Sequence, residues 1–159
     1  MFSIGDKVIY PRHGAGTIEG IEEKEVLGEK LKYYVIRISL GEMRVMVPID
    51  KLEAHGIRNI TPKERIEDIY GILSSKTTVM CKNWSKRYRE NESRIKEGNI
   101  YEVAELVRNL TVADRDKKLS TGEKRMLENA RQMLISELML ILDESYENIS
   151  EAVQNMIKT

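Results

Sequence analysis

Apolar and polar positions alternate in the first third of the chain, as they do in half-buried strands. Residues 17–22 (Thr-Ile-Glu-Gly-Ile-Glu) show this period of two clearly. Other short runs are rich in β-branched and aromatic residues, which favour strands, and they lie at 7–10, 33–38 and 43–48. Turn-forming segments separate them, at 11–14 (Pro-Arg-His-Gly), around Gly28 and at Gly41-Glu42. This pattern predicts about five short strands in a small, strongly bent antiparallel barrel.

The periodicity changes to that of helices at residue 61. Thr61-Pro62-Lys63-Glu64 has the form of a capping box with proline at the first helical position. Ser120-Thr121-Gly122-Glu123 has the form of a second capping box. Asn83 and Ser145 are suitable N-caps, and Gly98 is a suitable residue just past a helix end.

Apolar residues recur every three or four positions after these start signals, and they predict five helices. The third stripe runs from Ile100 to Leu110, and the fourth runs from Met126 to Ile141. Helices with short joints form compact bundles. The sequence therefore predicts an α+β protein of two domains, a small β-barrel at 1–56 and an all-α bundle at 61–159.

The charge balance limits what this chain can bind through long-range attraction. Its 159 residues carry 26 Lys and Arg against 26 Asp and Glu, so no net field draws it to nucleic acid or to an anionic membrane. Any nucleic-acid contact must be local and weak, with roughly four to six phosphates neutralised. Such a protein needs a second anchor, and another protein is the simplest one.

The most distinctive segment is 83–89 (Asn-Trp-Ser-Lys-Arg-Tyr-Arg), which contains the only tryptophan. On a helix, Trp84 and Tyr88 lie one turn apart on the same face, with cations beside them. One interpretation is a core tryptophan on a helix with solvated cations. The other is a nucleic-acid contact, in which cations meet phosphates and the ring stacks on a base step. The tryptophan's place in the first helical turn favours the second interpretation.

No pattern for catalysis, a cofactor or a metal site is present. His13 and His55 are the only histidines and Cys81 is the only cysteine, so neither histidine has nearby ligands to complete a metal set and Cys81 has no adjoining histidine. Residues 14–16 (Gly-Ala-Gly) lack the Gly-Lys-Ser/Thr ending of a phosphate loop. We therefore expect a protein that is not an enzyme. It also has no signal-like N-terminus and no long apolar run, which predicts a cytoplasmic protein without a membrane partner, and nothing requires more than a monomer.

Three motifs in this order resemble the bacterial CarD transcription regulators over essentially the full chain. They are Val-Ile-Tyr-Pro-x-His-Gly-x-Gly at 8–16, the segment 83–89, and Leu-Ser-x-Gly-Glu-Lys-Arg-Met-Leu at 119–127. The first motif alone also resembles the RNA-polymerase-interacting module of the transcription-repair coupling factor. No helicase motif is present, so the second and third motifs favour CarD.

The resemblance implies a Tudor-like N-terminal domain that docks on the β subunit of RNA polymerase. It also implies a helical domain that contacts promoter DNA at the upstream edge of the transcription bubble and stabilises the open complex. In that family a tryptophan matching Trp84 is a wedge in the minor groove. The residues implied to contact the DNA backbone are Lys86, Arg87, Arg89 and Lys124.

The polymerase contacts of the family map to Lys24 and Met46. The family often has a basic residue where Met46 stands. Arg44 lies two positions away on the same strand face and would supply the basic group in its place. Val45 and Val47 would support the edge strand if the sheet docks by adding to a sheet of the partner. The alternative hypothesis is a protein–protein adaptor that docks on the polymerase and has no direct DNA role.

Overall fold

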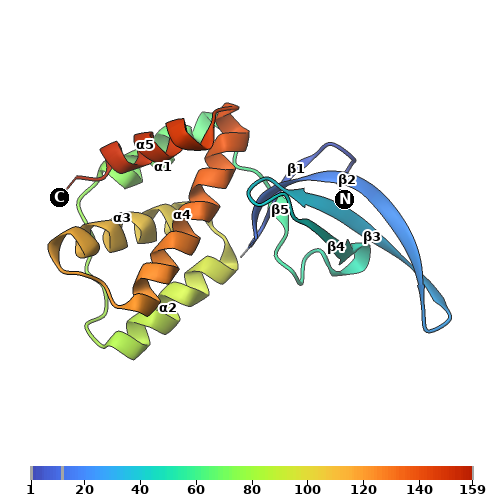
Figure 1. Cartoon of the computed structure of the whole chain (residues 1–159), viewed down its shortest axis with the longest axis horizontal. Helices are drawn as coiled ribbons and strands as arrows, with labels where there is room; N and C mark the ends of the chain where they lie inside the picture. Colours follow the sequence, from blue (N-terminus) through green and yellow to red (C-terminus); the bar gives the residue numbers. More distant parts are fainter. Residues whose placement is uncertain (1, 12, 159) are drawn as a thin grey trace.

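The chain folds into an N-terminal antiparallel sheet and a C-terminal group of helices, so it is a two-domain α+β protein (Figure 1). The computed structural model describes residues 2–11 and 13–158. In these ranges the strands are β1 (Lys7–Tyr10), β2 (Gly14–Val26), β3 (Glu29–Ile38), β4 (Arg44–Pro48) and β5 (Arg58–Asn59). The predicted turn at 11–14 contains Arg12, which lies outside the described residues. The domain limits of 1–56 and 61–159 stay a prediction.

The sheet has the strand order β4-β3-β2-β1-β5, with antiparallel neighbours throughout. β2 and β3 continue well beyond the rest of the sheet as a long hairpin that projects from the molecule (Figure 1). Val26 pairs with Glu29, so the hairpin closes through Leu27 and Gly28, both at positive φ (52° and 82°). The turn predicted around Gly28 is therefore confirmed, and it joins the ends of β2 and β3.

The fifth strand was not predicted where it occurs. Arg58 and Asn59 pair with Ile9 and Val8 of β1, in the segment that we interpreted as a domain boundary. A strand of two residues is too short to show a period of two, so only its pairing reveals it. The inner face of the sheet has its own core, made of Val8, Ile18, Tyr34, Ile36, Ile38, Val47 and Ile57.

The five predicted helices are present in the described residues. They are α1 (Ile66–Ser74), α2 (Trp84–Glu97), α3 (Ile100–Asp116), α4 (Thr121–Leu142) and α5 (Tyr146–Met156), with short 3-10 turns at Ile49–Lys51 and Lys63–Arg65. The predicted N-caps are confirmed, because the side chains of Asn83, Ser120 and Ser145 each accept a backbone N–H of the first turn. Gly98 ends α2 in the left-handed conformation, as predicted.

The first predicted capping box is wrong. Pro62 precedes a 3-10 turn, α1 begins only at Ile66, and neither start has a side-chain cap. The hydroxyl of Thr61 instead donates to the carboxylate of Glu137, 76 residues away. This hydrogen bond is charge-assisted, and such bonds are stronger than those between neutral groups, so it sets the direction of the Thr61 side chain.

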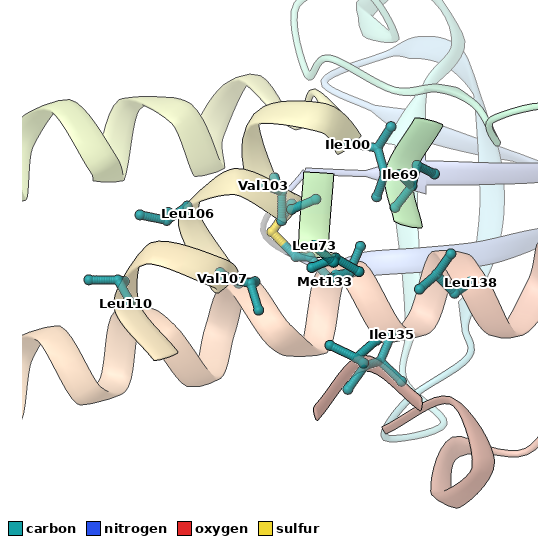
Figure 2. Close-up of a cluster of buried hydrophobic side chains, with 14 of the residues drawn as sticks. Ile69, Leu73, Ile100, Val103, Leu106, Val107, Leu110, Met133, Ile135 and Leu138 are labelled. Atoms are coloured by element: carbon teal, nitrogen blue, oxygen red, sulfur yellow. The ribbon is translucent and has the colours of Figure 1, made fainter. Parts of the chain in front are cut away.

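The helices enclose a core that lies mainly between α3 and α4, with α1 and α5 packed against it. Its central side chains include Leu73, Val103, Leu106, Leu110 and Leu138 (Figure 2). Among the described residues, no helix combines the length and the apolar character that a membrane crossing requires.

Candidate nucleic-acid interface

Trp84 lies at the surface and is not part of the helical core. It is the first residue of α2, directly after the cap formed by Asn83, and 47% of it is exposed. The Asn83 side chain accepts the N–H of Lys86 at 3.0 Å and so fixes the first turn of the helix. A large aromatic side chain that is half exposed on a fixed backbone is available for contact with a partner.

Trp84 is in contact with Tyr88 of its own helix and lies close to Gly122 of α4. Its ring stacks on Tyr88, with ring centroids 5.2 Å apart and planes inclined by 21°. Gly122 of α4 lies beneath this pair: a Cβ at that position would be 3.5 Å from Tyr88 Cε2 and 3.9 Å from Trp84 Cζ2. We call Trp84 and Tyr88 the aromatic ridge. The first turn of α4 therefore supports the ridge and limits the ways in which the Trp84 ring can turn.

Arg87 points inward from the same helical turn. Its Nε and Nη2 donate to the two carboxylate oxygens of Glu123 at 3.0 and 3.1 Å, and Nη1 donates to the carbonyl of Cys81. The Glu123 side chain is 6% exposed and that of Arg87 is 20% exposed. This ion pair joins the first turns of α2 and α4, which are the two turns that build the ridge. The predicted phosphate contact of Arg87 is untested, and its guanidinium is already occupied by protein groups.

The remaining predicted cations stay at the surface. Lys86, Arg89 and Lys124 are exposed, and of these three only Lys86 has an acidic partner among the described residues, Glu90 at 4.0 Å. That distance and exposure make the pair weak. Exposed cations next to these segments in the sequence include Lys82, Lys117, Lys118 and Arg125, which we did not single out. Lys117 and Lys118 come just before α4 and line an open hollow together with Arg87, Ser120 and Glu123. In the sequence they could have been noticed as two adjacent lysines just before a helix start. The helix dipole also favours anions at that position.

Sequence reasoning missed Gly122 and Glu123 as residues that hold the ridge. Both were visible only as parts of a capping box. Ser120 does accept the Glu123 N–H, at 3.3 Å, but the Glu123 carboxylate turns to Arg87. No local pattern distinguishes a glutamate that caps its own helix from one that pairs with another helix.

The residues mapped to polymerase contact lie on β4, at one end of the strand order, and on β2, its middle strand. Lys24 is exposed on the hairpin arm, and Arg44 and Met46 share one face of β4. Val47 is 1% exposed and belongs to the sheet core, and Val45 packs against that core, so both hold the strand from its inner face. β4 is the end of the strand order, and in the described residues it pairs with β3 alone.

Arg44 already has an acidic partner. Its Nε donates to Glu19 at 2.7 Å, and Arg37 lies 3.5 Å from the same carboxylate. Glu19 is the residue at which the β2–β3 register shifts, between the paired residues Ile18 and Gly20. The hydrogen bond from Arg44 lowers the pKa of Glu19 below its ordinary value, and the pKa of Arg44 rises for the same reason.

The two histidines contact one tyrosine. The hydroxyl of Tyr10 hydrogen-bonds His55 Nδ1 at 3.0 Å, and the His13 ring lies edge-on to the Tyr10 ring at 4.6 Å. Across the part of the chain that the structure describes, no three His, Cys, Asp or Glu side chains gather as a metal site would require.

Comparison with known proteins finds one family match in each of the two parts of the chain. Residues 68–154 match the family model described as CarD, C-terminal domain, and residues 2–61 match the CarD-like/TRCF RID domain. The chain is 46% identical over 141 residues to YdeB of Bacillus subtilis (strain 168), a protein named as a candidate transcription factor. The match covers 89% of this chain and 92% of YdeB.

Two solved structures from Myxococcus xanthus are similar to part of the chain. The 72-residue N-terminal domain of CarD, solved by solution NMR, is 37% identical, with 37% of this chain and 79% of that one covered and a TM-score of 0.32. CdnLNt is 45% identical, with 38% and 84% covered and a TM-score of 0.33.

Proposed function

The chain belongs to the CarD family of transcription factors, and from that premise we propose that it is a non-enzymatic regulator of promoter opening in the bacterial cytoplasm. It carries the RNA-polymerase-interacting domain of its family at residues 2–61. In our proposal the sheet docks on the β subunit of RNA polymerase. The aromatic ridge then contacts promoter DNA at the upstream edge of the transcription bubble and stabilises the open complex.

The observation that carries the proposal is the state of Trp84. It is half exposed, yet it is stacked on Tyr88 and supported by Gly122. A side chain that is exposed but already ordered loses little conformational freedom on binding. This is what an aromatic wedge requires, because unstacking a base step already costs about a few kcal/mol and ordering a mobile ring would add to that cost.

The surrounding charges support contact with a DNA backbone. Lys86, Arg89 and Lys124 are exposed near the ridge, and they can neutralise phosphates without first breaking a buried ion pair. In this proposal Arg87 has a different role from theirs, because its pairing with Glu123 holds the ridge. Contacts of this kind position a protein on DNA but do not read sequence, so the binding should be largely independent of sequence.

Docking on the polymerase by strand addition is supported by the position of β4. It is one of the two ends of the strand order and pairs with β3 alone among the described residues, and its outer face presents Arg44 and Met46. Val45 and Val47 hold the strand from below, which agrees with a supporting role. Lys24 on the hairpin arm lies two strands away from β4, so it would reach a separate part of the partner.

The effect on transcription follows from linkage. A wedge that fits only the unwound edge binds the open state better than the closed one, and every ~1.4 kcal/mol of that preference shifts the balance about tenfold. Docking on the polymerase raises the local concentration of the ridge at the DNA, which compensates for a weak DNA contact.

The test is the lifetime of polymerase–promoter open complexes with wild-type protein, with Trp84→Ala and with Ile4→Ala, at two salt concentrations. Ile4 is an exposed apolar residue (64%) on the sheet side and serves as the matched control. We expect a longer lifetime with wild type and Ile4→Ala, and loss of the extension with Trp84→Ala at unchanged polymerase affinity. If Trp84→Ala extends the lifetime as wild type does, the wedge is refuted and the chain is an adaptor on the polymerase.

A further inference from the structure

One guanidinium connects the sheet to both helices that build the ridge. Arg58 of β5 donates from Nη1 and Nη2 to the Glu137 carboxylate of α4, at 3.0 and 2.7 Å. Its Nε and Nη2 also donate to the carbonyl of Gly98, at 3.1 and 2.8 Å. Gly98 is the residue that ends α2. A cation at this point satisfies an unpaired carbonyl at the negative end of the helix.

We call the contacts of Arg58 with Glu137 and Gly98 the joint between the sheet and the helices. Within it, Glu137 is buried and all of its bonds are to protein groups. Only 1% of it is exposed, and besides Arg58 it accepts the N–H and the hydroxyl of Thr61, both at 2.8 Å. A buried carboxylate is stable only when such partners replace its hydration. Glu137 therefore fixes both the end of the sheet and the residue where the chain enters the helical part.

A second set of contacts comes from the β1–β2 corner. Ser136, next to Glu137, accepts the Ala15 N–H at 3.0 Å. Gly14, with φ of +95°, lies so close that a Cβ there would be 2.9 Å from Ser136 Oγ. At the other side, a Cβ on Gly98 would be 2.9 Å from the ring of Pro11. The sheet is thus seated on α4 and on the end of α2 at several points.

We propose that Arg58 and Glu137 are positioning residues that hold the aromatic ridge at a fixed place relative to the polymerase-docking sheet. This inference rests on the proposed function and adds a coupling between its two contacts. If the joint were flexible, the docked protein would have to lose orientational freedom each time the ridge engaged the DNA. The joint removes that freedom before binding. The free energy gained by docking on the polymerase is therefore not reduced by the need to orient the ridge at the DNA fork.

The rigidity of the joint is tested by the distance between two spin labels. The labels are placed at Leu27→Cys on the hairpin tip and Val79→Cys ahead of α2, which are 99% and 96% exposed, in a Cys81→Ser background. The variants are Glu137→Gln and Arg58→Lys, and Glu151→Gln at an exposed site of α5 is the control for a lost charge. We expect one narrow distance distribution in the parent and the control, and a broad one in both joint variants.

The consequence for function is tested with unlabelled protein in the open-complex assay. Glu137→Gln should lose the lifetime extension to the level of Trp84→Ala while the affinity for polymerase stays unchanged. The double variant Trp84→Ala/Glu137→Gln should lose no more than Trp84→Ala alone, since a ridge that is absent cannot be misplaced. Arg58→Lys, whose native side chain is 30% exposed, takes the place of Glu137→Gln if the latter fails to fold.

The two proposals fail in different ways. A narrow distance distribution in the joint variants, or a broad one with the full lifetime extension, overturns the positioning role of Arg58 and Glu137. Absence of a lifetime extension with wild-type protein overturns the proposed function, because that result does not depend on the joint variants. Additive losses in the double variant also overturn the positioning role.

Discussion

Removing the carboxylate of Glu123 measures what holds the aromatic ridge in place. In Glu123→Gln the side chain keeps its size, but Arg87 loses an ionic partner at 3.0 Å, and an amide group takes the place of one carboxylate oxygen. Loss of one member of a buried ion pair costs about 3–5 kcal/mol. We expect about 2–3 kcal/mol here, since a fifth of Arg87 is exposed to water and its bond to Cys81 is kept.

The assay is urea unfolding followed both by Trp84 fluorescence and by far-ultraviolet circular dichroism. For a chain of this size, the expected loss in the free energy of unfolding corresponds to a fall of about 4–12 °C in Tm, which thermal unfolding would measure. Arg87→Met and Glu123→Met should each be similarly destabilising, whereas the double variant Arg87→Met/Glu123→Met should recover to within ~1 kcal/mol of wild type, because no unpaired charge remains. The fluorescence of folded Glu123→Gln should also change, as the support of the ridge loosens.

Either of two results in the unfolding experiments refutes this reasoning. If each single variant costs less than ~0.5 kcal/mol, or if the double variant costs the sum of the two, then Arg87 and Glu123 do not stabilise each other. The salt dependence of promoter binding gives a second check. Loss of a phosphate contact reduces the slope by ~0.9, so we expect that change for Arg89→Met and none for Arg87→Met.

Three further predictions concern other positions. Gly122→Ala should raise stability by about 0.5–1 kcal/mol and leave Trp84 fluorescence unchanged, since its Cβ would make only ordinary contacts with the ridge; thermal unfolding measures this. Leu27→Asn should stabilise the hairpin by about 1 kcal/mol, because Leu27 is exposed and has φ of 52°, which asparagine tolerates better; chemical unfolding measures this. In an NMR titration, the pKa of Glu19 should lie below its ordinary value and should rise in Arg44→Ala. The stabilisation from the Glu19–Arg44 pair is complete above the ordinary pKa of Glu19 and is lost as the pH falls through its lowered pKa.

Local signals were sufficient wherever the interacting groups are close in sequence. The caps at Asn83, Ser120 and Ser145 bond N–H groups three residues ahead, and Gly98 ends α2 through its own conformation. Apolar periodicity located the helices and the four longer strands because a buried face imposes a period of two or of 3.6 on the residues themselves. The exposure of Trp84 could also be anticipated, since the first turn of a helix is poorly covered.

What depended on the tertiary structure was the choice of partner among chemically equivalent ones. Thr61 and Glu123 both had the spacing of capping boxes, yet Thr61 bonds Glu137 and Glu123 pairs with Arg87, over separations of 76 and 36 residues. Arg87 could not be told from Arg89 by sequence, although one faces Glu123 and the other faces water. Such pairings are decided when elements distant in the chain pack together and water is removed, because only then does an unpaired charge become costly. The sequence by itself thus determined the elements and the surface that carries the ridge, and the packing of those elements determined which charges hold it and which stay free.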